Sequence, residues 1–172
     1  MPGRAWYDRG WESESELVAL ATFERCCVSK PRAIVAICND LERLLATALQ
    51  ELDAVFDIAE EVADHLEGLQ AVGLLLSLME RNELVEWGTP GPVVHAVETF
   101  FKRGYEPLLL ESVCRAPTSH TLWMTNRVLN GVPENQQVQF LSAIRQAANR
   151  KDVSEEVRQT ALGFLALQQV KL

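Results

Sequence analysis

Residues 34–66 read IVAICNDLERLLATALQELDAVFDIAEEVADHL, and this stretch decides the fold class. Apolar side chains recur every three or four positions from Ile34 to Leu66, which is the period of an amphipathic α-helix. The pattern predicts one long acidic helix of about 35 residues, or two helices that meet at a kink, with Asn39 and Glu42 capping a second start. The stretch closest to a strand, AIVAIC at 33–38, lies inside this helical pattern, so no strand is expected.

Proline and glycine divide the rest of the chain into further helical segments. Ser13 and Glu16 form a capping box ahead of a helix that ends near Ser29, and a very apolar helix is expected over 69–80. The segment EWGTPGP at 86–92 cannot continue a helix, so it separates residues 1–86 from residues 92–172 within one predicted domain of 1–172. Shorter helices are expected over 92–103, 106–115, 119–130 and 133–149, and a last helix, capped by Asp152 or Ser154, to Gln169.

The short connections between these segments predict an all-α fold of stacked antiparallel helical hairpins. Residues 151–162, KDVSEEVRQTAL, resemble the second helix of a HEAT-type repeat, in which an acidic residue precedes a Val-Arg pair and then Ala and Leu. One copy is clear and no fixed period recurs. We therefore expect a HEAT-like stack rather than a regular repeat array.

The charge balance restricts the classes of partner. The 172 residues include 24 acidic and 16 basic side chains, for a formal net charge of −8. Nucleic acid and acidic membrane surfaces are excluded as partners because binding them requires a basic surface, whereas a basic protein is favoured. The N-terminus lacks a signal-peptide pattern and no apolar run reaches the ~20 residues of a membrane span, so a cytoplasmic protein is expected.

Four cysteines, Cys26, Cys27, Cys38 and Cys114, match no zinc-ligand spacing. They are expected to be reduced thiols. Cys26, Cys38 and Cys114 fall within the apolar periodicity, which predicts that they lie in the core. Neither a metal nor another cofactor is expected.

The net charge is concentrated in residues 40–67. This window holds nine acids and one base, Arg43, whereas 15 acids and 15 bases lie outside it. Like charges four residues apart on a helix repel each other, and no base at the neighbouring turns relieves that repulsion. The pattern favours either a solvated face or a docking surface for a basic protein, since a cation site needs carboxylates that converge from different directions. Five of the acids share one predicted helix face: Asp53, Asp57, Glu60, Glu61 and Asp64.

Two other positions are candidates for function. Trp87, in the break, is either an apolar anchor for a partner or a core residue that closes the loop. His95 and Glu98 form an H-x-x-E pair on one helix, but the E-x-x-H motif of a di-iron bundle is missing. No nucleophile elbow or phosphate loop occurs, so we expect no enzyme, and a metal protein or small helical enzyme centred on His95 and Glu98 is a weaker alternative.

Residues 123–130 read WMTNRVLN, the most distinctive motif in the chain. Trp123 and Arg127 lie one helical turn apart, so the guanidinium can pack beside the indole or reach an acid on an adjacent helix. Asn130 is placed to end the helix, with Gly131 beyond it. We predict that these residues form a packing and capping unit, with contact to a partner as the alternative.

Residues 93–147 resemble the all-helical immunity proteins of bacterial polymorphic toxin systems. The resemblance rests on His95, Glu98, Tyr105, Leu108, Leu109, Trp123, Arg127, Val128, Leu129 and Asn130. It does not extend to residues 1–90. It implies a small cytoplasmic antitoxin that binds a cognate toxin domain, often a nuclease, and catalyses no reaction. An acidic face would complement the basic cleft of a nuclease. The alternative is a HEAT-like scaffold that binds a host protein without any toxin.

Overall fold

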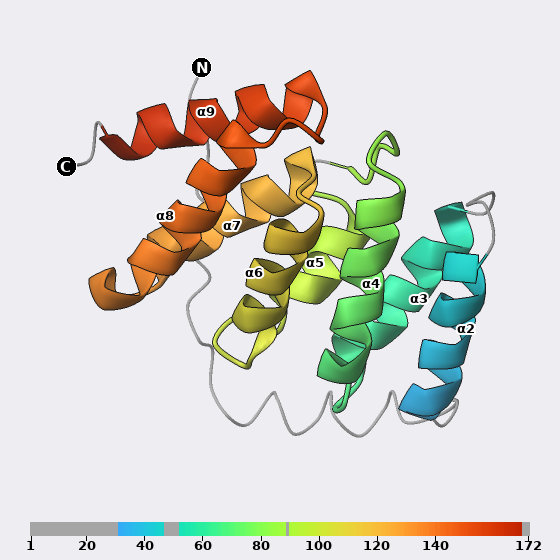
Figure 1. Cartoon of the computed structure of the whole chain (residues 1–172). Helices are drawn as coiled ribbons and strands as arrows, with labels where there is room; N and C mark the ends of the chain where they lie inside the picture. Colours follow the sequence, from blue (N-terminus) through green and yellow to red (C-terminus); the bar gives the residue numbers. More distant parts are fainter. Residues whose placement is uncertain (1–30, 47–51, 89, 170–172) are drawn as a thin grey trace, which may run out of the picture. The chain divides into compact units, whose positions relative to one another are not determined.

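A computed structural model of the chain describes residues 31–46, 52–88 and 90–169, and within these ranges it has eight helices and no strand. The prediction of an all-α fold is confirmed. The predicted helix over 13–29, with its capping box and with Cys26 and Cys27, lies outside the described residues. Figure 1 shows the helices in chain order: α2 (Ile34–Ala46), α3 (Leu52–Asp64), α4 (Leu69–Arg81), α5 (Pro92–Glu98), α6 (Tyr105–Arg115), α7 (Ser119–Gly131), α8 (Glu134–Asn149) and α9 (Glu155–Gln169).

The apolar pattern of residues 34–66 is divided between two helices, α2 and α3, each 13 residues long. Of the two predicted alternatives, two helices is therefore correct. Asn39 does not start the second one, because it lies inside α2. Each helix buries the same kind of apolar stripe, so the period alone could not locate the division. The buried residues are Ile34, Ile37 and Leu41 in α2, and Val55, Ile58, Ala59 and Val62 in α3.

Most helices contact a neighbour in the chain and also the second helix along the chain. α2 contacts α4, α4 contacts α6 and α6 contacts α8, while α3 contacts α5 and α7 contacts α9. The pairs α2–α3, α4–α5, α6–α7 and α8–α9 also pack together (Figure 1). Helices on both sides of the break at 86–92 therefore belong to one unit, which extends from Arg32 to Leu172. A closer likeness to HEAT repeats stays a prediction.

α4 lies at the centre of the core, as its composition predicts. It contacts α2, α3, α5, α6 and α7. Its position brings polar residues near its C-terminal end, such as Glu80, against α6. The buried residues of α4 are Ala71, Val72, Leu75, Leu76, Leu78 and Met79.

α5 begins at Pro92 as predicted but ends at Glu98, rather than near residue 103. The following turn contains Lys102 at φ 60° and Gly104 at φ 112°, both in the left-handed region that ends a helix. α6 starts directly after Gly104. The last helix is capped by Ser154, whose Oγ accepts a hydrogen bond from the backbone N–H of Val157 at 3.2 Å.

Gly131 and Gly163 allow the effect of close packing on stability to be distinguished from the effect of helix propensity. A Cβ on Gly131 would lie 2.7 Å from Cζ of Phe101, whereas Gly163, inside α9, has nothing within 4 Å. We expect Gly163→Ala to raise the free energy of unfolding by about 0.5–1 kcal/mol, because alanine favours the helix. Gly131→Ala should lower it by about 1–3 kcal/mol through overpacking. Denaturant unfolding followed by circular dichroism measures both, and a gain from both variants would contradict the close contact with Phe101.

Candidate functional site

Four of the five carboxylates predicted to share a face of α3 are exposed. α3 places them away from its buried stripe of Val55, Ala59 and Val62. Within the described part of the chain, none of the four has a hydrogen bond or an ion pair. The protein's own described cations therefore leave them uncompensated. We call this set the α3 acidic face: Asp53, Asp57, Glu60 and Asp64.

Glu61 differs from these four residues because Arg32 pairs with it. Oε1 of Glu61 lies 3.4 Å from Nη1 of Arg32, and the same guanidinium pairs with Asp40 on α2. Arg43 also pairs with Asp40. These ion pairs link α2 to α3, so Glu61 and Asp40 act within the fold. The counter-charge of Glu61, Arg32, lies outside the acidic window of the sequence, and contact of Glu61 with a partner stays a prediction.

Leu66 departs from the predicted apolar stripe. α3 ends at Asp64 and residues 65–68 turn, so that Leu66 is 94 % exposed. The turn is tightly packed at Gly68, where a Cβ would lie 2.7 Å from Cζ of Phe100. An exposed leucine two residues after Asp64 adds an apolar group next to the end of the α3 acidic face. Protein interfaces commonly combine an apolar core with a polar rim.

Trp87 belongs to the core. Its side chain is 1 % exposed, and its Nε1 is buried without a hydrogen-bond partner among the described residues. The loop around it is tight, because Gly88 has φ 90° and a Cβ on Gly91 would lie 1.4 Å from the carbonyl oxygen of Trp87. Of the two interpretations for Trp87, the structure supports the core residue that closes the loop. A surface anchor for a partner is corrected on this ground.

α5 and α7 bring Glu98, Trp123 and Arg127 together. Nη1 of Arg127 lies 3.1 Å from Oε2 of Glu98, and its Cζ lies 4.9 Å from the centre of the Trp123 ring. The guanidinium thus makes both predicted contacts at once. The Glu98 side chain is 14 % exposed and that of Arg127 is 49 % exposed, so the carboxylate is the more buried member of the pair.

The environment of this pair changes the acidity of two groups. Burial raises the pKa of the Glu98 carboxyl, and the charges of Arg127 and His95 only partly offset that rise. Burial also raises the pKa of Tyr105, and the carboxylates of Glu98 and Glu106 add to the effect. The Tyr105 hydroxyl is therefore protonated at neutral pH. A cavity of about 200 Å³ lies against these groups and is lined by Glu98, Phe101, Tyr105, Arg127, Val128 and Gly131.

Asn130 does not end its helix in the predicted way. α7 continues through Gly131, and the residue that caps it is Val132 in extended backbone. Oδ1 of Asn130 accepts a hydrogen bond at 3.1 Å from Nε2 of Gln168, which also donates to Asn126 at 2.7 Å. Asn130 therefore links α7 to α9. Glycine is needed at position 131 because a Cβ there would clash with Phe101, and not because the backbone is left-handed.

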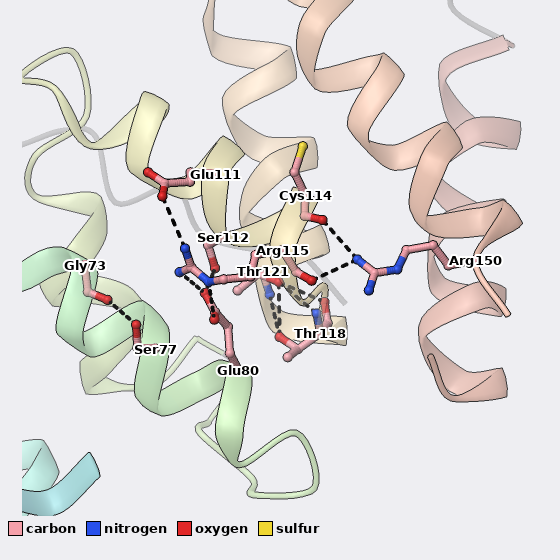
Figure 2. A network of polar contacts seen from close by, with 10 residues as sticks. All are labelled: Gly73, Ser77, Glu80, Glu111, Ser112, Cys114, Arg115, Thr118, Thr121 and Arg150. Atoms are coloured by element: carbon pink, nitrogen blue, oxygen red, sulfur yellow. Dashed lines mark hydrogen bonds and ion pairs between the residues drawn. The ribbon is translucent and has the colours of Figure 1, made fainter. Parts of the chain in front are cut away.

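A polar network that sequence analysis missed joins α4 to α6 (Figure 2). Glu80 accepts a hydrogen bond from Oγ of Ser112 at 2.6 Å, and from Nε and Nη2 of Arg115 at 3.0 and 2.8 Å. The hydrogen bond that Arg115 donates to Glu80 raises the pKa of Arg115. Ser112 and Arg115 lie 32 and 35 residues from Glu80 in sequence, so no local spacing signals the network.

Arg150 holds the C-terminal end of α6. Its Nη1 donates to the carbonyl oxygens of Cys114 and Arg115, each at 3.0 Å, as Figure 2 shows. The last carbonyls of a helix lack partners within it and carry partial negative charge, so a guanidinium satisfies both needs. On its other side Arg150 pairs with Asp152, and this hydrogen bond lowers the pKa of Asp152 to about 2.

We expect Arg150→Ala to lower the free energy of unfolding by about 1–2 kcal/mol, because two helix-end carbonyls lose their donor. The melting temperature should fall by about 2–8 °C. Arg145→Ala, an exposed arginine on α8, is the matched control and should change the free energy by less than about 0.5 kcal/mol. Calorimetry on both variants checks this, and equal losses would argue against the capping role.

The two described cysteines differ. Cys38 is half-buried on α2, and burial followed by the charge of Glu42 raises the pKa of its thiol. Cys114 is exposed, which corrects the prediction that it lies in the core. It lines a groove of about 810 Å³ between residues 102–114 and 132–140. The buried side of α6 includes Leu109 and Val113 and does not include Cys114.

His95 and Glu98, the pair considered for metal or catalytic chemistry, lie on α5 close enough for the charge of His95 to lower the pKa of Glu98. His95 is exposed on α5, and Nε2 of His120 lies 4.0 Å from an oxygen of Glu86. Over residues 31–46, 52–88 and 90–169, no group of three or more His, Cys, Asp or Glu side chains converges on a point that could hold a metal ion. None of the helices in these ranges is both long and apolar enough to cross a membrane.

Comparison with known proteins identifies no relative: no family model, no curated protein and no solved structure matches the chain. Two sets of residues remain as candidate sites. One is the α3 acidic face, and the other is the cluster of Glu98, Tyr105, Trp123 and Arg127 with its cavity.

Proposed function

We propose that this chain is a non-enzymatic inhibitor that binds a basic toxin domain through the α3 acidic face, and so acts as an immunity protein. The observation that carries the proposal is that all four carboxylates of the face are exposed and have no described counter-charge. A field of one sign accelerates association with a partner of the opposite sign and rejects others. A nuclease-type toxin, with a basic cleft for phosphates, would suit this face.

The α3 acidic face destabilises the helix that carries it. Asp53 and Asp57, and likewise Glu60 and Asp64, are like-charge pairs four residues apart, each destabilising by roughly 0.2–0.5 kcal/mol. Asp64 also ends α3, where the helix dipole disfavours negative charge. A surface that weakens its own helix and pairs with no described cation is suited to a role in binding. The resemblance of residues 93–147 to immunity proteins supports a toxin as the partner.

Affinity capture from a lysate of the source organism, with three baits, tests the proposal. Beside the wild type stand two variants with the same change in net charge. The α3 variant carries Asp57→Lys, Glu60→Lys and Asp64→Lys. The control variant carries Glu42→Lys, Glu134→Lys and Glu156→Lys, three exposed acids on other helices.

The expected result is one basic protein that the wild type and the control variant retain and the α3 variant loses. That protein should arrest growth when expressed alone, and co-expression of the wild-type chain should restore growth. A retained partner that is harmless when expressed alone would favour the scaffold alternative. Equal retention by the α3 variant would contradict a role for the α3 acidic face.

A further inference from the structure

The cavity beside the Glu98–Arg127 pair presents three kinds of polar group within a small space. Glu98 offers carboxylate oxygens, Arg127 offers N–H donors, and Tyr105 offers a hydroxyl. Phe101 and Val128 supply apolar walls, and Gly131 leaves room for the Phe101 ring. The cavity thus combines a few polar groups with apolar walls, which is typical of a ligand site.

Tyr105 is the residue that the fold alone does not explain. Its side chain is 1 % exposed, and its ring packs edge-on to Phe101 with the centroids 6.5 Å apart. Its hydroxyl has no hydrogen-bond partner in the described part of the chain. The oxygen is also not among the fully enclosed unpartnered atoms there, which are Oε2 of Glu61 and Nε1 of Trp87. Tyr105 lines the cavity together with Glu98 and Arg127, where phenylalanine would pack equally well.

Arg127 likewise has N–H donors that no described residue accepts from. Glu98 contacts its Nη1, and the Trp123 ring covers one face of the guanidinium. No other hydrogen bond involves this side chain among residues 31–46, 52–88 and 90–169. N–H groups at the edge of the guanidinium are thus available to a ligand, next to an acceptor and a second donor.

We propose that this cavity binds a primary amide, with Glu98 accepting from the amide NH₂ while Tyr105 and Arg127 donate to its carbonyl oxygen. Glu98 and Arg127 together carry no net charge, so an anion would meet the carboxylate and a cation would meet the guanidinium. A primary amide donates at one end and accepts at the other, which matches the three groups. A cavity of about 200 Å³ suits one small group rather than a nucleotide.

Three small probes of similar size and different charge test the site: propionamide, propionate and propylammonium. Titrated into the full chain, propionamide should shift the NMR signals of the Arg127 Nε–H and the Gly131 amide saturably. The two charged probes should bind at least 10-fold more weakly. No saturable shift with propionamide, or equal affinity for a charged probe, would overturn the proposal.

Two variants sharpen the test. Tyr105→Phe removes only a hydroxyl that has no partner among the described residues, so the fold should be unaffected while propionamide binds about 10-fold more weakly, the equivalent of one hydrogen bond. Unchanged affinity would overturn the role of Tyr105. Glu98→Gln keeps the shape but leaves Arg127 without its counter-charge, so the preference should switch from propionamide to propionate. A retained preference for propionamide in Glu98→Gln would contradict the charge argument.

The amide can come from an Asn or Gln side chain of a partner protein, or from a free amide such as glutamine. The affinities of L-glutamine, with L-glutamate as control, and of the captured partner are compared between wild type and Tyr105→Phe. Weaker partner binding by the variant assigns the amide to the partner. Weaker glutamine binding with unchanged partner affinity assigns it to the small molecule. The site lies on α5, α6 and α7, so it can fail or hold independently of the α3 acidic face.

Discussion

The α3 variant is expected to bind its basic partner about 100-fold more weakly than the wild type at low ionic strength, mainly through a slower association rate. It replaces three negative charges by three positive ones on a surface that has no described counter-charge. The remaining Asp53 cannot restore a field of the same sign. Surface plasmon resonance with the captured partner measures both rate constants.

Salt dependence separates this expectation from damage to the fold. The Debye length falls from about 30 Å at 0.01 M salt to about 8 Å at 0.15 M, so the wild type should lose association rate over this range. The association rate of the α3 variant should not fall over this range of salt concentration. The control variant, with the same net charge, should associate like the wild type. If the two variants behave alike, net charge rather than the α3 acidic face sets the rate, and the proposed docking surface is wrong.

The same variant should fold more stably, by about 0.5–1 kcal/mol, because two of its substitutions relieve unfavourable charge contacts. Asp57→Lys places an opposite charge one helical turn from Asp53, where a like charge stood. Asp64→Lys places a positive charge at the negative end of the helix dipole. Thermal unfolding at low salt gives the difference. A rise in stability together with a loss of binding would show that the acidic face serves the partner and not the fold, whereas a loss of stability would show that these carboxylates contribute to the fold.

The sequence predicted the helices well where chemistry marks their ends. Pro92 starts α5, and the breaks at Gly104 and Pro117 divide the later helices close to the observed positions. It could not locate the division within 34–66, because α2 and α3 continue one apolar period. It also placed Leu66 in the buried stripe, since nothing in the local pattern shows that α3 ends two residues earlier.

Contacts in the candidate site could be predicted where the two partners lie close together in the sequence, and not where they lie far apart. The Trp123–Arg127 contact is one turn long and was predicted, and the acid that Arg127 reaches on another helix is Glu98. The pairing of Arg32 with Glu61 and that of Arg115 with Glu80 span 29 and 35 residues. Such contacts depend on which helices pack together, and hydrophobic periodicity does not contain that information.

Arg127→Ala is expected to lower the free energy of unfolding by about 2 kcal/mol at pH 7, or roughly 4–8 °C in melting temperature. The loss comes mostly from Glu98, whose largely buried carboxylate then has no counter-charge. It should be smaller than the roughly 3–5 kcal/mol of a fully buried pair, because half of the Arg127 side chain is exposed and solvent screens it. Arg103→Ala is the matched control: Arg103 lies 5.1 Å from the Phe100 ring centre and has no carboxylate partner in the described residues, so it reports the cation–π contribution alone.

The loss in Arg127→Ala should depend on pH in a direction fixed by Glu98. Its pKa in the folded protein is raised above the unfolded value, so the folded state holds the proton more tightly, and stability falls as pH rises through the window between the two values. Arg127 lowers that pKa, so its removal raises it further and steepens the fall. The stability of the variant should therefore approach that of the wild type below the unfolded pKa of about 4.3, and the variant should lose most stability above the folded pKa.

Adding Glu98→Gln should recover most of the loss at pH 7, because a neutral amide needs no counter-charge. Calorimetry from pH 4 to pH 8 on the four members of this double-mutant cycle gives the coupling, and a loss that is the same at every pH would assign Arg127 to packing on Trp123 instead.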